Sequence, residues 1–147
     1  MSAIVDKLIQ AKSSGNYQGL VAAIPYAEFL GITVEHRDTG LVTKMSFTEK
    51  LIGNPAIPAL HGGTIGALLE SAAIFQLFYQ AETVTVPKTI TITIDYLRSG
   101  RPADIFARAV VTKHGKRVAN VRAEAWQDDP NLPIATANVH LLLTPQG

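Results

Sequence analysis

The chain contains no cysteine, which excludes disulfide bonds, thiolate metal ligands and a cysteine nucleophile. It also lacks an excess of either charge, because the formal net charge is only +1, so no overall field points to nucleic acid. Residues 1–11 show no basic segment followed by a long apolar run, so no secretory signal is expected. The longest apolar stretch carries Glu70, Ser71 and Gln76 and is short for a membrane span. These absences predict a cytoplasmic protein that binds neither nucleic acid nor a membrane.

What is present is enough apolar sequence for a real core. The chain has 147 residues, of which 47% are hydrophobic, and this composition argues against disorder. We therefore expect a single domain over residues 1–147, with an N-terminal helical segment and connector over 1–31.

The spacing of apolar residues predicts short helices first, then strands on both sides of one long helix. The short helices are expected over 3–12 and 18–23, and a connector over 24–31 is expected to pack Tyr26, Phe29 and Leu30 inward. Strands are expected over 32–36, 41–47, 88–97, 104–114, 116–127 and 133–143. Turns are expected at 38–40, at Gly115 and at 128–131, and the Gly- and Pro-rich segment 49–60 is expected to be a loop.

The long helix is expected over 63–81, and its apolar residues surround it almost completely, which is typical of a buried helix. Strands segregated around one helix favour an α+β fold: an antiparallel sheet of about five to six strands wrapped around that helix. One sheet cannot cover such a helix fully. We therefore expect a second copy of the chain to complete the burial, giving at least a homodimer.

One carboxylate, Glu70, interrupts this apolar helix. Buried acids are costly and are rarely kept without a partner or a task. The helix opens with His61-Gly62-Gly63, and glycines at a helix start leave backbone N–H groups open to an anion. An acid combined with an anion-binding helix end is suited to acyl transfer or hydrolysis.

A second feature is the uneven distribution of charge. Seven bases and one acid, Asp104, lie between Arg98 and Arg122, which gives this stretch a net charge of +6. Such a region suits a small polyanion such as a phosphorylated cofactor. It is equally typical of a solvated sheet face whose bases prevent aggregation at the edge.

His61-Gly62-Gly63 with an acid at Glu70 resembles the signature of hotdog-fold acyl-CoA thioesterases of the phenylacetate-pathway (PaaI-like) group. Residues 24–31 resemble the segment that precedes the first strand in this family, 95–98 the strand after the helix, and 110–121 the glycine-turned hairpin. The resemblance implies a hotdog fold, active sites at a subunit interface, and dimers that often pair into tetramers. It implies acyl-CoA substrates, with coenzyme A as part of the substrate, and no metal or redox cofactor.

The resemblance also implies roles for the residues at the helix. Glu70 would activate water as a general base or attack the thioester directly, where many relatives have Asp. The alternative is a structural carboxylate. Gly63 would supply an oxyanion-hole N–H while Gly62 shapes the turn, or both glycines only permit close packing. His61 would orient the thioester or contact the leaving sulfur, or serve as a structural hydrogen-bonding residue.

Two further residues are less directly matched to the family. Asn54 would bind the water or the carbonyl, although the family places its amide one residue later and Gly53-Asn54-Pro55 also suits a turn. Thr89 would bond the attacking water, or it is simply a β-branched strand residue. The candidates for the phosphates of coenzyme A are Arg98, Arg101, Lys116 and Arg117. The four histidines show no ligand spacing, so no metal site is expected.

Acyl-CoA thioester hydrolysis is thus the leading hypothesis, and two alternatives remain. One is a non-catalytic acyl-CoA-binding protein on the same fold. The other is a hotdog dehydratase or hydratase, because those enzymes use a His–acid pair and His61 with Glu70 offers both residue types. In those dehydratases and hydratases, however, the His usually lies further upstream of the acid than His61 lies from Glu70.

Overall fold

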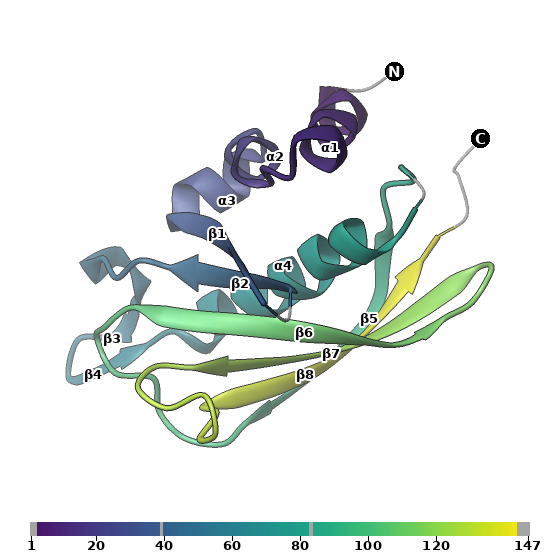
Figure 1. Ribbon diagram of the computed structural model, residues 1–147. Coiled ribbons are helices and arrows are strands. Elements are labelled where there is room, and N and C mark those ends of the chain that lie inside the picture. Colours follow the sequence, from purple (N-terminus) through teal and green to yellow (C-terminus); the bar gives the residue numbers. More distant parts are fainter. Residues whose placement is uncertain (1–2, 39, 83, 144–147) are drawn as a thin grey trace.

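The computed structural model describes residues 3–38, 40–82 and 84–143, and it contains one large sheet with a long helix across one face (Figure 1). The helices are α1 (Ala3–Ser14), α2 (Gln18–Ala22), α3 (Pro25–Leu30) and α4 (Gly62–Gln80), with a 3-10 turn at Glu49–Leu51. The strands are β1 (Ile32–Arg37), β2 (Gly40–Met45), β3 (Ile52–Asn54), β4 (Ile57–Leu60), β5 (Lys88–Tyr96), β6 (Ile105–His114), β7 (Val118–Trp126) and β8 (Ala135–Leu142).

The large sheet has six strands in the order β1-β2-β6-β7-β8-β5, and all neighbours are antiparallel. The strands β1 and β5 therefore form its two edges. The expected α+β arrangement of one antiparallel sheet around one helix is confirmed. The sequence boundaries agree with the structure to within a few residues, as expected for elements with clear periodicity.

Alanines on the central strands form the surface on which α4 rests. The register aligns Ala107, Ala125 and Ala135 in one row across β6, β7 and β8, and Ala109, Ala123 and Ala137 in the next. All six are buried. Because their side chains are short, the helix can approach the sheet closely, and its larger residues Leu68, Leu69 and Phe75 fill the remaining space.

Two segments differ from the sequence-based expectation. The connector over 24–31 contains α3, which begins with Pro25 and ends at Gly31 in the left-handed conformation (φ 70°). Tyr26 and Phe29 do not pack inward: each is 58% exposed, and their rings stack on each other. A helix of six residues has only one buried face, and Ala27 and Leu30 occupy it.

The expected loop over 49–60 instead contains β3 and β4, which pair as a small separate hairpin. Strands of three and four residues with proline in or near them give no clear alternation, so the sequence pattern does not reveal them. Of the predicted turn at 38–40, Thr39 lies outside the described residues. Within the described part of the chain, no helix is long and apolar enough to cross a membrane.

Candidate active site

The start of α4 is organised around His61, the residue that precedes the helix. Its backbone is extended (φ −63°, ψ 129°), and its N–H donates to the carbonyl of Leu51 at 2.8 Å. Its ring Nδ1 accepts from the N–H of Gly63 at 2.8 Å. His61 is therefore the N-cap of α4. Because Nδ1 accepts, the proton of a neutral ring lies on Nε2, which can donate to another group.

This arrangement distinguishes the two glycine amides. The Gly63 N–H, which the sequence suggested as the oxyanion donor, is occupied by His61. The Gly62 N–H has no hydrogen-bond partner among residues 3–38, 40–82 and 84–143. The open donor at the helix start is thus the Gly62 N–H. The His61 ring makes a structural hydrogen bond, which is one of the two roles expected from the sequence.

Both glycines are also needed for space. A Cβ at Gly63 would lie 2.9 Å from His61 Nδ1, and a Cβ at Gly62 would lie 3.2 Å from three atoms of Tyr96. One turn later, a Cβ at Gly66 would meet Ile94 Cδ1 at 2.8 Å. Among the described residues, positive φ occurs only at glycines elsewhere in the chain, so close approach is the reason for glycine here.

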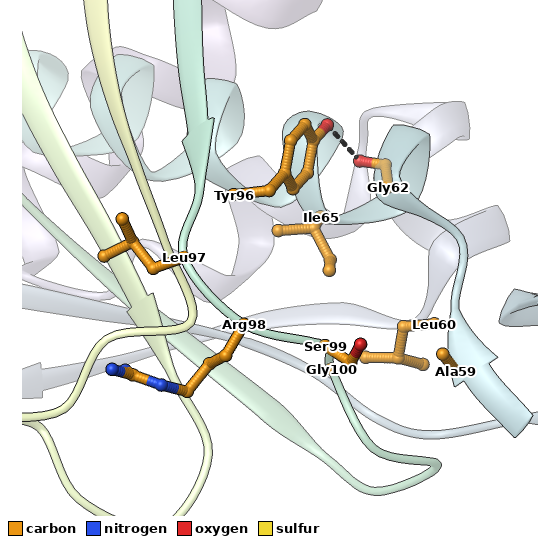
Figure 2. Close-up of a pocket in the computed structure, with 9 residues that line it drawn as sticks. All are labelled: Ala59, Leu60, Gly62, Ile65, Tyr96, Leu97, Arg98, Ser99 and Gly100. Atoms are coloured by element: carbon orange, nitrogen blue, oxygen red, sulfur yellow. Dashed lines mark hydrogen bonds between the residues drawn. The ribbon is translucent and has the colours of Figure 1, made fainter.

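A cavity of about 390 Å³ lies beside this helix start. Its walls come from the end of β4, the first turn of α4 and the segment after β5 (Figure 2). Gly62 and Ile65 line it on the helix side, and Tyr96 and Arg98 on the strand side. The cavity combines an apolar wall, a free backbone amide and one guanidinium.

Glu70 lies two turns further along α4 and is half-buried. The prediction that it is buried is wrong for the single chain. It lies on the helix face that also carries Gly63, Ala67 and Ile74, all of them at least partly exposed, and the sheet does not cover this face. Its carboxylate has no hydrogen bond or ion pair with any residue that the structure describes.

The two other candidates lie at different distances from the helix start. Asn54 lies near it, because it pairs with the cavity residue Ala59, but its Oδ1 accepts from the Ala56 N–H at 2.9 Å in the β3–β4 turn. This is the turn chemistry that its sequence context suggested as an alternative. Thr89 is half-buried near the beginning of β5, whereas the helix start contacts Tyr96 at its end, about 23 Å away along an extended strand.

The four candidate bases also divide into two groups. Arg98 lines the cavity and donates to the Pro133 carbonyl, and Arg101 forms an ion pair with Asp128. Lys116 and Arg117 lie in the β6–β7 turn. The register places this turn at the same end of the sheet as Lys88 of β5, away from the helix start of the same chain. In the described part of the chain, no cluster of three His, Asp or Glu residues could hold a metal ion.

Tyr96 is a site residue that the sequence did not reveal. Its hydroxyl donates to the Gly62 carbonyl at 2.7 Å (Figure 2). The alternation of β5 explained it as one more apolar strand position. The only available signal was the pair Gly62 and Gly66, one helical turn apart, which indicates that another element approaches that face closely.

Comparison with known proteins adds an independent observation. A family model described as "Thioesterase superfamily" matches residues 58–134, a range that contains the helix start, Glu70 and Thr89. The medium/long-chain acyl-CoA thioesterase YigI of Salmonella typhimurium is 29% identical over 129 residues, which cover 78% of this chain and 82% of that protein.

Solved structures agree. A protein from Chromobacterium violaceum is 39% identical with a TM-score of 0.77, and the match covers 95% of this chain and 97% of that one. A phenylacetic acid degradation-related protein from Ralstonia eutropha shares the fold at 21% identity and a TM-score of 0.74, over 92% of this chain and 98% of that one. The hotdog fold and the similarity to PaaI-like thioesterases, both predicted from the sequence, are confirmed.

Proposed function

The chain belongs to the thioesterase superfamily and is therefore a thioester hydrolase, and on that premise we propose that it hydrolyses acyl-CoA thioesters to the free acid and coenzyme A. The single observation that carries the site is the start of α4. Gly62, whose N–H has no partner among the described residues, lines a cavity there, and a carboxylate without a partner among them follows on the same helix. The acyl-CoA substrate is supported by the name of the YigI relative, which describes that protein.

We propose that the Gly62 N–H stabilises the oxyanion of the thioester. An N-terminal amide carries the positive end of the helix dipole, and a donor of this kind contributes roughly 3 kcal/mol to lowering the barrier. The Gly63 N–H can join only if the His61 ring turns away. While it stays in place, the ring directs Nε2 outward, where it can contact the thioester or its sulfur.

Glu70 acts as general base for water or as the nucleophile itself. In the first case it takes a proton from water, whose oxygen attacks the carbonyl; in the second its own oxygen attacks and an anhydride forms, which water then hydrolyses. Both routes break the C–S bond and release the thiolate of coenzyme A, which takes up a proton.

The distance between the helix start and Glu70 along α4 indicates whether both can act on one thioester within the same chain. Gly62 and Glu70 lie eight positions apart on the helix, which corresponds to about 12 Å at 1.5 Å per residue. One thioester carbonyl cannot contact both at hydrogen-bond distance. The proposed site therefore joins the amides of one chain to the Glu70 of a second copy.

A second copy of the chain can bind at the free edge of β5. This strand pairs only with β8, and Ile90, Ile92 and Ile94 on its helix-facing side remain partly or fully exposed. An exposed edge strand of nine residues with no charged side chain in its middle can pair with another strand. Antiparallel pairing of two β5 strands about a two-fold axis gives the proposed homodimer, and a homotetramer would form if two such dimers associate.

This pairing also brings the beginning of one β5 toward the end of the other. Thr89 of a second copy would approach the helix start, and Lys116 and Arg117 of that copy would follow, because their turn lies at the same end of the sheet, with β8 between it and the beginning of β5. We propose that these bases and the Arg98 of the first chain bind the phosphates of coenzyme A. Arg101 contributes less, because Asp128 already neutralises it.

The test is the substitution Glu70→Gln, assayed by thiol release with short, medium, long and aromatic acyl-CoAs. It removes the basic oxygen and keeps the volume, so kcat should fall by about 10² or more while KM and Tm change little. The matched control is Glu28→Gln on the exposed side of α3, which should behave as wild type.

Three results would contradict the proposal. Tight acyl-CoA binding with no turnover would indicate a binding protein, and conversion of an enoyl or hydroxyacyl group without release of thiol would indicate a hydratase or dehydratase. Hydrolysis unchanged by Glu70→Gln would remove Glu70 from the mechanism.

A further inference from the structure

Tyr96 ends β5, and its ring lies across the first turn of α4 (Figure 2). The hydroxyl donates to the Gly62 carbonyl at 2.7 Å. The ring atoms Cε1 and Cζ lie 3.2 Å from the point where a Gly62 Cβ would be. The same residue thus contacts Gly62 both by packing and by a hydrogen bond.

This contact is built into both elements. Gly62 and Gly66 lie one turn apart on the same helix face. A Cβ at Gly62 would press on Tyr96 at 3.2 Å, and a Cβ at Gly66 would displace Ile94 Cδ1, 2.8 Å away. The remaining neighbours in the cavity wall are mostly apolar, and Arg98 directs its guanidinium to Pro133. Among the described residues, Tyr96 makes the only side-chain hydrogen bond to the Gly62 carbonyl.

The bond acts on the amides through peptide geometry. The Gly62 carbonyl and the Gly63 N–H belong to one planar peptide unit, so fixing the oxygen also fixes the direction of that N–H. Donation to a carbonyl also polarises its peptide and strengthens the N–H as a donor. On the other side of Gly62, the same contacts hold the residue whose own N–H is open to the cavity.

We propose that Tyr96 is a positioning residue for the oxyanion hole: its hydroxyl and ring hold Gly62 in place, so that the Gly62 N–H points at the thioester oxygen and the adjoining Gly62–Gly63 peptide stays fixed. This role rests on the proposed hydrolase function. Tyr96 itself acts through the backbone and not on the reacting atoms.

The test is Tyr96→Phe, which removes one oxygen and keeps the ring packed on Gly62. We expect kcat for acyl-CoA hydrolysis to fall about tenfold, a smaller loss than the roughly 10²–10³ that follows removal of an oxyanion donor itself. KM should change less than about twofold, because the hydroxyl supports only the transition state. The matched control is Tyr26→Phe, whose hydroxyl has no partner among the described residues and whose loss should leave kcat unchanged.

A second measurement does not depend on activity. In ¹⁵N–¹H correlation spectra, Tyr96→Phe should shift the Gly63 amide resonance and increase its hydrogen-exchange rate, and Tyr26→Phe should do neither. Equal kcat for wild type and Tyr96→Phe, or a rise in KM alone, would overturn the positioning role and leave the hydrolase function intact. If no acyl-CoA is hydrolysed by the wild type, the proposed function fails, and an unshifted Gly63 amide would overturn the positioning role separately.

Discussion

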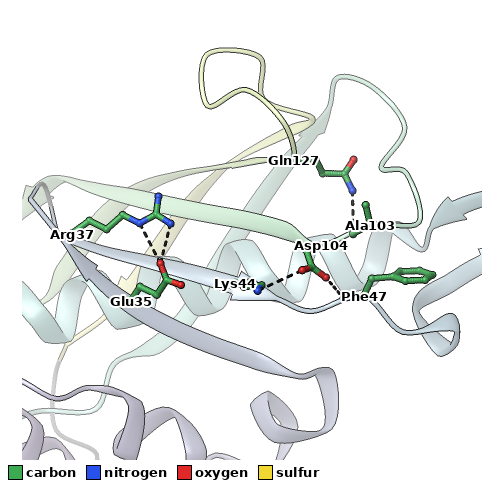
Figure 3. A network of polar contacts seen from close by, with 7 residues as sticks. All are labelled: Glu35, Arg37, Lys44, Phe47, Ala103, Asp104 and Gln127. Atoms are coloured by element: carbon green, nitrogen blue, oxygen red, sulfur yellow. Dashed lines mark hydrogen bonds and ion pairs between the residues drawn. The ribbon is translucent and has the colours of Figure 1, made fainter.

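Asp104 shows how one side chain connects two parts of the chain. Its Oδ1 accepts from the Phe47 N–H at 2.7 Å, and its Oδ2 lies 3.5 Å from Lys44 Nζ (Figure 3). The bond from the Phe47 backbone is the main cause that lowers the pKa of Asp104; burial opposes the shift, and Lys44 adds to it. The carboxylate therefore fixes the end of β2 to the beginning of β6.

The direction of that pKa shift predicts a pH dependence. Because the folded-state pKa lies below the usual 3.8, ionised Asp104 stabilises the fold above that value, and the gain is lost as the pH falls through the lower folded pKa. The side chain is 46% exposed, so screening by water limits the gain.

Asp104→Asn should thus lower the free energy of unfolding by about 1 kcal/mol at pH 7, and the loss should be smaller at pH 2, where the carboxylate takes up protons. Urea unfolding of both proteins at the two pH values measures this, with the exposed Asp95→Asn as control. An equal loss at both pH values would show that the carboxylate charge is irrelevant.

At the scale of elements, α1 is attached to the end of α4. Lys12 Nζ donates to the Phe78 carbonyl at 2.6 Å and also to the Ala81 carbonyl. These carbonyls lie at the negative end of the helix dipole and have no partners within the helix. Burial lowers the pKa of Lys12, and the charge of Glu82 partly opposes that effect.

We expect Lys12→Met to lower the free energy of unfolding by about 1–2 kcal/mol, because the substitution keeps the aliphatic stem but removes both hydrogen bonds. Lys7→Met, on the exposed side of the same helix, serves as the control and should change little. Chemical denaturation measures both. A similar loss in the two variants would mean that the cap contributes nothing specific.

At the scale of the whole molecule, the site that we propose joins the helix start of one chain to the Glu70 of a second copy. Gly62→Pro removes the open N–H at the first position of the helix, where proline fits the backbone when the preceding residue is extended, as His61 is. Its Cβ would lie 3.2 Å from Tyr96, so Gly62→Ala, which adds the same Cβ and keeps the N–H, is the steric control and should retain activity. Glu70→Gln removes the acid. Gly62→Pro and Glu70→Gln should each inactivate both sites of a homodimer.

A heterodimer of the two variants should recover activity. One of its two sites keeps both native groups, so co-expressed chains with different tags, purified over both tags, should show about half the wild-type activity per dimer. The two homodimers are the controls. A heterodimer as inactive as its parents would show that both groups act from the same chain, and a monomeric mass in light scattering would exclude the shared site.

Sequence reasoning succeeded where periodicity is strong. The long helix, the alternating strands and the glycine-opened helix start were all predicted, because burial imposes the 3.6 and 2.0 periods directly on residue choice. It failed for β3 and β4, for the orientation of Tyr26 and Phe29, and for the exposure of Glu70. In those cases the outcome depends on which neighbours cover a residue, and the local pattern does not contain that information.

The sequence by itself determined that one apolar helix with an acid and a glycine start lies among antiparallel strands, since helix and strand periods and the absence of cysteine follow from the order of residues alone. Only the tertiary structure decided what holds Gly62, because Tyr96 lies 34 residues further along the chain and reaches the Gly62 carbonyl through folding. It also decided that Glu70 lies on the uncovered face of α4, because that depends on where the sheet ends.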